Sequence, residues 1–335
     1  MSIVMTGGGT GGHLAIIKAV KEHLHDEELI YIGSTKGQDK QWFEEDEDFS
    51  HKYFFETRGV VNQGALGKVK SLLMMAKATM KAIKLLRKHK AKVVFSVGGF
   101  SAAATAFAAK ILRIPLVIHE QNAALGSLNK LLKPHAAAFI SSYLEESPIK
   151  AYPIKQIFFE NAHMREKVNT IIFLGGSQGA KAINTLALQI APQLKAKGIK
   201  IIHQAGQNNI DEVAKAYEDL GVEAEVFGFT DKLADYMNQA DLAIARAGAS
   251  TLWELSATAL PTLYIPYPYA ASDHQYHNAQ FLVAKDLAWI MRENEIDAQM
   301  VLSLLDENLS EKSRGLMEIV EKDGSKKIAE VLTQM

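Results

Sequence analysis

Twice along the chain, a short apolar run ends in a glycine-rich loop that leads into a helical stretch. Residues 3–6 precede the glycine loop at 7–12, and residues 171–174 precede a second glycine loop at 175–180. Strands that are apolar over their whole length are covered on both faces, as in a parallel sheet flanked by helices. Each copy of the pattern therefore predicts the first strand–helix unit of a doubly wound α/β domain.

Short apolar runs continue to alternate with longer helical stretches through the rest of the sequence. We predict strands at 2–6, 29–33, 52–56, 92–97, 115–119, 136–141, 170–174, 200–204, 224–228, 241–245, 262–266 and 287–291. A length of 335 residues fits two domains, at roughly 150 residues each. We expect two Rossmann-like domains, with a boundary near 158–169, whose carboxyl strand ends face each other across a ligand-binding cleft.

The amino-acid composition excludes several classes of protein. The chain has 37 basic and 38 acidic side chains, so no strong overall field attracts nucleic acid. The absence of cysteine excludes disulfides, thiolate metal sites and a cysteine nucleophile, and fits a cytosolic protein. We expect neither a signal peptide nor a membrane-spanning helix, because the first residues lack a basic segment and no 18 apolar residues run uninterrupted.

The first glycine loop contains G-x-G-x-x-G at Gly7, Gly9 and Gly12. Glycines allow the backbone to approach a ligand closely, and the following helix N-terminus favours phosphate. A dinucleotide site also needs an acidic residue at the end of the second strand, but that strand ends in Gly33-Ser34. A nicotinamide oxidoreductase thus remains only an alternative, beside a glycine turn that merely packs a helix on a strand.

The second glycine loop includes Ser177, Gln178 and Gly179. A hydroxyl at Ser177 suits a phosphate held by backbone N–H groups. One glycine loop is weak support for a ligand site. Two loops at equivalent points of two domains indicate a phosphate-bearing ligand more strongly.

Polar segments follow three further strands. His119-Glu120-Gln121-Asn122 could bind a ligand or cap buried backbone. Glu254 lies at the start of a helix after the strand at 241–245. Its carboxylate could accept hydrogen bonds from a ribose diol, or it could be a surface glutamate that the helix dipole favours. The segment 273–279 offers amide and imidazole groups that suit sugar hydroxyls.

We predict no metal site. His274 and His277 lack the carboxylate of an H-E-x-x-H arrangement. Asp46 and Asp48 form a D-x-D, the pattern of metal-dependent sugar transferases, but they lie in an acidic run that is typical of a solvated face.

Residues 68–90 contain eight Lys or Arg and no Asp or Glu. Lys70, Lys77, Lys81, Lys84 and Lys88 fall on one helical stripe. Such a basic amphipathic helix is typical of an element that lies on an anionic membrane surface, although an ordinary solvated basic face is the alternative.

Together these segments resemble the MurG family of glycosyltransferases (glycosyltransferase family 28). The resemblance covers about residues 3–290 and rests on motifs at 8–13, 119–122, 175–180, 246–249 with Glu254, and 273–279. It implies the GT-B fold: an acceptor and membrane-facing domain at 1–160, a UDP-GlcNAc domain at 161–316, and a terminal helix at 317–335 that returns to the first domain.

The resemblance also implies the reaction of a UDP-GlcNAc-dependent hexosyltransferase. N-acetylglucosamine passes from UDP-GlcNAc, with inversion, to the C4 hydroxyl of the MurNAc unit of lipid I (undecaprenyl-pyrophosphoryl-MurNAc-pentapeptide), giving lipid II and UDP. This reaction belongs to peptidoglycan synthesis and so to cell-wall biogenesis, cell shape and cell division. A GT-B transferase or epimerase that uses UDP-GlcNAc with another acceptor is the alternative, and a non-catalytic membrane adaptor is a third.

We assign roles to the matching residues. His13 is the candidate general base, because a helix N-terminus lowers a histidine's pKa and keeps it neutral. His119 and Glu120 are the fallback bases. The expected substrate-binding residues are Thr10, Gly11, Gly12, Asn122, Arg165, Ser177, Gln178, Gly179, Phe229, Thr230, Ala249, Glu254, His274 and Gln275.

We expect no required cofactor, with at most a non-essential stimulation by Mg²⁺. The expected partners are UDP-GlcNAc, lipid I, an anionic membrane surface that contacts the helix at 68–90, and other cell-wall synthesis proteins, but no nucleic acid. The expected location is the cytoplasmic face of the bacterial inner membrane, as a peripheral protein.

Overall fold

The computed structural model describes residues 1–57, 65–160, 162–176 and 178–335, which form two compact units. Unit 1 comprises Met1–Ile154 and Lys322–Met335, and unit 2 comprises Lys155–Glu321. We predicted domain boundaries near residues 160 and 316, whereas the chain leaves unit 1 after Ile154 and returns to it at Lys322.

The sheet of unit 1 has six parallel strands in the order β3-β2-β1-β4-β5-β6. The strands are β1 (Ser2–Thr6), β2 (Glu28–Ser34), β3 (His51–Phe55), β4 (Ala91–Ser96), β5 (Leu116–His119) and β6 (Ala138–Ile140). The order reverses between β1 and β4, so the loops after these two strands flank the switch point at which doubly wound sheets bind ligands.

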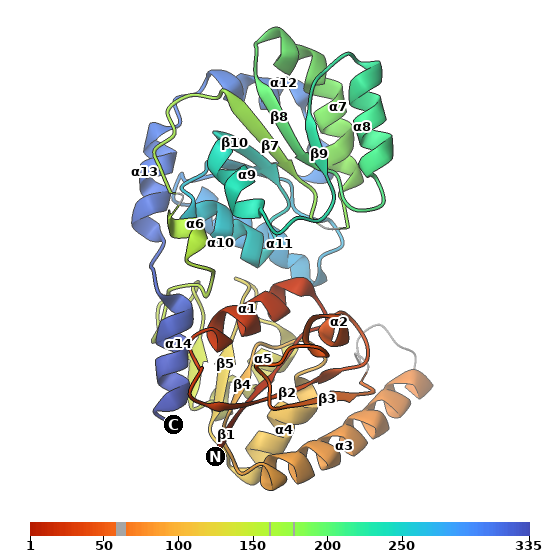
Figure 1. The fold of residues 1–335 in the computed structure, drawn as a ribbon, viewed down its shortest axis with the longest axis vertical. Coiled ribbons are helices and arrows are strands. Elements are labelled where there is room, and N and C mark those ends of the chain that lie inside the picture. Colours follow the sequence, from red (N-terminus) through yellow and green to blue (C-terminus); the bar gives the residue numbers. More distant parts are fainter. Residues whose placement is uncertain (58–64, 161, 177) are drawn as a thin grey trace. The chain divides into compact units, whose positions relative to one another are not determined.

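The helices of unit 1 surround its sheet, most of them packed on the strands and the last one on another helix (Figure 1). They are α1 (Gly11–Lys21), α2 (Asp39–Phe43), α3 (Ala65–Lys88), α4 (Ala103–Leu112), α5 (Ser127–Leu132) and α14 (Gly324–Thr333). Val4, Ile30 and Val94 of three neighbouring strands pack with Ala82 of α3 and Ala104 of α4 in one buried apolar cluster. Helix α14 packs on α1 instead, where Ser325 Oγ lies 3.1 Å from His23 Nε2.

Unit 2 repeats this topology, with its six parallel strands in the order β12-β11-β10-β7-β8-β9. The strands are β7 (Thr170–Leu174), β8 (Lys200–Gln204), β9 (Glu225–Phe227), β10 (Leu242–Ala245), β11 (Thr262–Tyr264) and β12 (Trp289–Ile290). Read from β9, the order is that of unit 1, and the switch point falls between β7 and β10. All twelve predicted strands are confirmed, within two residues at most of their ends.

The helices of unit 2 are α6 (Ile157–Glu160), α7 (Lys181–Ala196), α8 (Ile210–Asp219), α9 (Leu233–Gln239), α10 (Ala249–Ala257), α11 (His274–Val283), α12 (Ala298–Ser303) and α13 (Ser310–Ile319). The range 317–335, predicted as a terminal helix that returns to the first domain, contains all of α14, which belongs to unit 1, and the last residues of α13, which belongs to unit 2. Within the described ranges, every helix is too short or too polar to cross a membrane.

The structure gives Arg165 a different role from the predicted one. We expected it to contact substrate, but its side chain is buried, with 1% of the residue exposed. Its guanidinium donates hydrogen bonds to the carbonyl oxygens of Met237, Ala240, His163 and Thr258. Burial lowers the pKa of Arg165 to about 10, which leaves it charged at neutral pH. It therefore joins the start of unit 2 to the ends of α9 and α10.

Replacement of Arg165 by Met should destabilise unit 2 by about 3 kcal/mol or more, because buried carbonyl groups would lose a charged donor. Urea unfolding followed by circular dichroism measures this loss. The control is Arg314→Met, which removes only an exposed pair with Glu311 and should change the unfolding free energy by about 0.5 kcal/mol or less. Equal effects of the two substitutions would contradict this role for Arg165.

Candidate active site

The first glycine loop lies at the carboxyl end of β1, against the loop that follows β4. Gly9 has φ +86°, a conformation that favours glycine. A Cβ atom on Gly99 would lie 2.5 Å from the carbonyl oxygen of Gly8, so the two loops approach through their backbones. This close packing brings the N-terminus of α1 to the switch point of the sheet.

A buried carboxylate fixes the shape of this loop. Asp39 Oδ2 accepts the backbone N–H of Gly9 at 2.7 Å, and Oδ1 accepts the N–H of Ser34 at 3.0 Å. The Tyr31 hydroxyl lies 3.1 Å from Oδ1 and 2.8 Å from the carbonyl oxygen of Gly7. Burial, and then the charge of Asp39, raise the pKa of Tyr31, which keeps its proton.

We did not predict a role for Asp39. The dinucleotide pattern needs an acid at the end of the second strand, whereas Asp39 comes five residues after that strand, at the start of α2. The Asp39 oxygens accept hydrogen bonds from groups of this chain, so Asp39 stabilises the first glycine loop. The one signal in the sequence was an isolated acid shortly after a strand.

His13 lies in the first turn of α1 between two polar side chains. Its Nδ1 is 2.9 Å from Thr10 Oγ1, and its Nε2 is 3.1 Å from Gln121 Nε2. Gln121 comes from the polar segment after β5, so the fold joins two motifs that are 108 residues apart. We did not predict a role for Gln121. The contact indicates that it orients the imidazole ring.

The two fallback bases, His119 and Glu120, are both buried. His119 is fully buried, with its ring 5.5 Å from that of Tyr152, and neither ring nitrogen has a hydrogen-bond partner among the described residues. Burial, and then the charge of His13, lower the pKa of His119 to about 3. Such a histidine is neutral at pH 7 and out of reach of a substrate hydroxyl.

Glu120 is also buried and shapes the loop after β5. Its Oε1 accepts the N–H of Asn122 at 3.0 Å, and Oε2 accepts from Gly126 N–H and Asn129 Nδ2, both at 2.9 Å. Glu120 therefore holds the loop that carries the half-buried Asn122. Of the three candidate bases, His13 is the one with partial exposure at the edge of the sheet.

In unit 2 the second glycine loop lies at the carboxyl end of β7. The approach of Gly179 to Gly206 is so close that a Cβ atom on Gly206 would lie 2.3 Å from Gly179 Cα. Gln178 is exposed, and Ser177 lies outside the described residues. Helix α7 starts just after the loop, and its N-cap, Ala180, has no side-chain acceptor for the first N–H groups. These donors suit a phosphate.

The end of β10 supplies a second helix N-terminus in unit 2. Helix α10 begins at the buried Ala249 and carries Glu254 in its second turn. Burial raises the pKa of Glu254 to about 7, and the positive charge of Lys155 opposes this rise only in part. Glu254 can therefore change its protonation state near neutral pH. Arg246 at the start of this loop pairs with Glu293 at 2.6 Å.

The polar segment after β11 forms the third part of this edge. His274 Nδ1 donates to the carbonyl oxygen of Ala271 at 2.8 Å, and Gln275 Oε1 accepts the N–H of Tyr267 at 2.9 Å. These bonds set the orientation of both side chains. The predicted sugar-binding residues thus lie in the first turn of α11, just after the loop that follows β11.

Phe229 and Thr230 follow β9 at the same edge. We expected both residues to bind substrate, and the N–H of Phe229 donates to Gln207 Oε1 at 3.3 Å. Thr230 Oγ1 accepts the N–H of Lys232. Phe229 is 71% exposed, so its ring is available for contact with a planar ligand.

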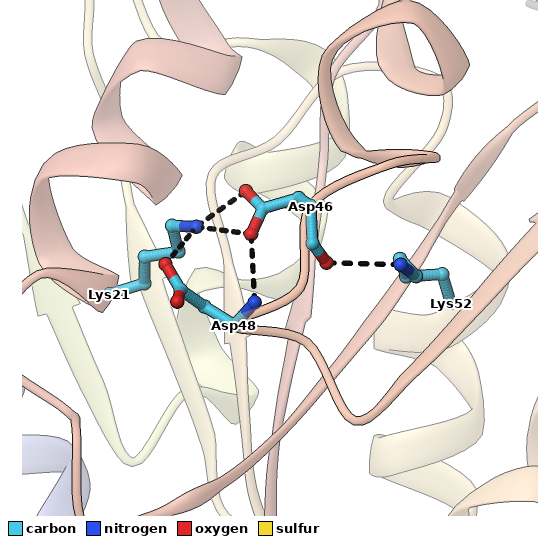
Figure 2. Close-up of polar contacts among 4 residues, drawn as sticks. All are labelled: Lys21, Asp46, Asp48 and Lys52. Carbon is cyan, nitrogen blue, oxygen red and sulfur yellow. Dashed lines mark hydrogen bonds and ion pairs between the residues drawn. The ribbon is translucent and has the colours of Figure 1, made fainter.

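The acidic run contains an internal ion cluster (Figure 2). Lys21 Nζ lies 2.5 Å from both carboxylate oxygens of Asp46 and 2.6 Å from Asp48 Oδ2, and the Lys21 side chain is only 4% exposed. Lys52 Nζ donates to the carbonyl oxygen of Asp46 at 3.0 Å. The expectation of a solvated face is thus wrong for Asp46. The Lys21 ammonium group thus lies between the carboxylates of Asp46 and Asp48.

The comparison with protein families identifies both parts of the chain. Residues 3–141 match the glycosyltransferase family 28 N-terminal domain, and residues 170–332 match the glycosyltransferase family 28 C-terminal domain. The chain belongs to glycosyltransferase family 28. Its sequence is 79% identical over 332 residues to a protein from Sulfurovum sp. (strain NBC37-1), covering 99% of this chain and 98% of the relative.

A second family 28 relative, from Sulfurimonas denitrificans, is 54% identical over 98% of this chain and 97% of its own length. Both relatives are named UDP-N-acetylglucosamine--N-acetylmuramyl-(pentapeptide) pyrophosphoryl-undecaprenol N-acetylglucosamine transferase. The crystal structure of Acinetobacter baumannii MurG matches all of this chain and 99% of its own, with a TM-score of 0.84 and 26% identity. The expected family and the GT-B architecture are thereby confirmed.

Replacement of Asp39 by Asn should loosen the first glycine loop, because an amide NH₂ group would face backbone N–H donors. We expect a loss of about 1–3 kcal/mol in unfolding free energy. Urea unfolding measures it, with Asp26→Asn, an exposed acid of unit 1, as the control. An unchanged unfolding free energy for Asp39→Asn would show that the loop does not depend on this carboxylate.

Proposed function

We propose that this chain transfers N-acetylglucosamine from UDP-GlcNAc to the C4 hydroxyl of the MurNAc unit of lipid I, with inversion, giving lipid II and UDP. The observation that carries the proposal is the 79% identity, over nearly the full length of both chains, to a relative named for this transfer. The chain also keeps a glycine loop and a helix N-terminus at the switch point of each unit.

Unit 2 binds the donor in this proposal. The N-terminus of α7 and the loop containing Ser177, Gln178 and Gly179 hold the diphosphate, whose negative charge grows as the sugar leaves. Oriented N–H donors stabilise such charge without a metal, by about 3–4 kcal/mol per donor in other enzymes. Glu254 accepts hydrogen bonds from the ribose diol, and Phe229 and Thr230 contact the uracil. His274 and Gln275 bind sugar hydroxyls.

Unit 1 binds the acceptor and supplies the base. Thr10, Gly11 and Gly12 lie at the N-terminus of α1, which suits the pyrophosphate of lipid I. His13, oriented by Thr10 and Gln121, takes the proton of the attacking hydroxyl, and Asn122 contacts the sugar. No cofactor is required in this scheme, and Mg²⁺ gives at most a non-essential stimulation.

Transfer of radiolabel from UDP-GlcNAc to a short-chain lipid I analogue, with and without EDTA, tests the proposal. We expect labelled lipid product in both conditions. Absence of transfer together with a UDP-induced rise in melting temperature would preserve the nucleotide site and refute lipid I as the acceptor. A UDP-GlcNAc 2-epimerase from Neisseria meningitidis shares the fold, with a TM-score of 0.62 and 14% identity, so epimerisation is the second activity to assay.

Replacement of His13 by Ala in the same assay should lower kcat by about 10²–10⁴-fold, the usual contribution of general base catalysis. Its Kd for UDP should change little, because unit 2 binds the nucleotide. The control is His25→Ala, an exposed histidine of unit 1. A loss of UDP affinity as large as the loss of kcat would make His13 a binding residue.

The Glu254 carboxyl, with a pKa of about 7, should make UDP binding depend on pH. The ionised form accepts both ribose hydrogen bonds, so affinity should fall by up to about tenfold per pH unit below pH 7. Calorimetric titration between pH 5.5 and 8.5 measures this slope. Glu254→Gln separates it from protonation of UDP itself, and the same slope in that variant would contradict the role of Glu254.

We further propose that α3 places the protein on the cytoplasmic face of the inner membrane. Lys77, Lys81, Lys84 and Lys88 of the basic stripe are exposed, while the side chains of Lys68 and Lys70 lie outside the described part. Three large apolar side chains of the same helix, Leu72, Leu73 and Met80, are also exposed, each by more than half. Exposed apolar groups beside exposed lysines suit an anionic lipid surface.

Sedimentation with vesicles that contain anionic lipid tests this surface. Reversal of Lys77, Lys81 and Lys84 to Glu should reduce binding by more than tenfold, at roughly 1 kcal/mol for each cation lost near the surface. Binding of the unmodified protein should also weaken with salt. The control reverses Lys195, Lys197 and Lys215 of unit 2, and an equal reduction there would contradict a specific role for α3.

A further inference from the structure

Three side chains that commonly bind metal ions meet at the amino edge of the unit 1 sheet. Glu28 begins β2, His51 begins β3, and His89 lies in the turn between α3 and β4. One carboxylate oxygen and one nitrogen from each ring all lie within 4.8 Å of one another. The predicted substrate residues of unit 1 lie at the other, carboxyl edge, so this cluster has no part in the proposed transfer.

The geometry of the two imidazole rings supports metal binding. The ring centroids of His51 and His89 are 4.6 Å apart. His89 is held from two sides: its Nε2 lies 2.8 Å from the Tyr53 hydroxyl, and its carbonyl oxygen accepts the Ser2 hydroxyl at 2.9 Å. A hydrogen bond at one ring nitrogen, like that to Tyr53, orients histidines that bind metal through the other in other proteins.

The chemistry of the donors favours zinc over magnesium or calcium. Two imidazoles and one carboxylate form a common zinc ligand set, which leaves a fourth position for water.

The side chains must move only slightly to bind an ion. Bonds of about 2.0–2.2 Å to a tetrahedral zinc ion place its ligand atoms roughly 3.4 Å apart. Glu28 and His51 are exposed, so rotation of their side chains can close the difference from 4.8 Å while His89 stays in place.

We propose that Glu28, His51 and His89 form a binding site for one divalent transition-metal ion, zinc above all. The bound ion would connect β2, β3 and the turn before β4. Because these three segments are adjacent only in the folded chain, the ion would stabilise unit 1. The site stands apart from the proposed transfer reaction, which needs no metal.

Titration of the EDTA-treated and dialysed full chain with ZnCl₂ at pH 7.5, followed by calorimetry, tests the proposal. We expect one ion per chain with a micromolar Kd and a rise in melting temperature. His51→Gln and Glu28→Gln should each weaken binding more than tenfold. His135→Gln, which removes an exposed histidine of unit 1 outside the cluster, should bind zinc as the unmodified protein does.

Cobalt(II) provides a second readout that does not depend on stability. Co²⁺ bound in a tetrahedral site should give visible absorption bands that disappear in His51→Gln and on addition of zinc. Equal zinc affinity in His51→Gln and the unmodified chain would overturn the proposal, as would the absence of binding at 100 µM zinc, a concentration of about 100 times the expected Kd. Transfer activity in EDTA should be the same in His51→Gln and the unmodified chain, which separates this site from the proposed function.

Discussion

The hydrogen bond from Gly9 N–H to Asp39 connects the architecture of unit 1 to its chemistry. The glycine loop can turn sharply because it lacks side chains, but the same freedom gives it no shape of its own. The Asp39 carboxylate, buried and bonded also to Ser34 and near Tyr31, supplies that shape. The N-terminus of α1 and His13 take their positions from this loop.

The two units support their glycine loops with different groups. Both have a six-stranded parallel sheet of the same topology and a helix N-terminus at its switch point. In unit 1 the buried Asp39 carboxylate stabilises the glycine loop, whereas the glycine loop of unit 2 packs on a second glycine, Gly206. Arg165, a buried cation bonded to carbonyl oxygens, stabilises unit 2 some distance along the chain from that loop. Topology thus repeats while the supporting interactions do not.

Much of the site could be predicted because its residues follow strands, and the ends of parallel strands share one edge. This rule placed Thr10, Asn122 and Glu254 correctly at the carboxyl edges of their sheets. It could not distinguish a ligand-facing side chain from a buried one. His119 and Glu120 satisfy the same pattern, yet both are buried. The roles of Asp39 and Gln121 could not be predicted because their partners, Gly9 and His13, lie 30 and 108 residues away.

By itself the sequence determined the class of fold, the twelve strands, the two glycine loops and the family, because apolar periodicity and glycine spacing are local properties of a chain. Only the tertiary structure decided which polar groups are bonded to one another. It paired Lys21 with Asp46 and Asp48, oriented His13 with Gln121, and raised the pKa of Glu254 to about 7. Burial and hydrogen bonding depend on neighbours that are distant in sequence, and packing alone brings those neighbours together.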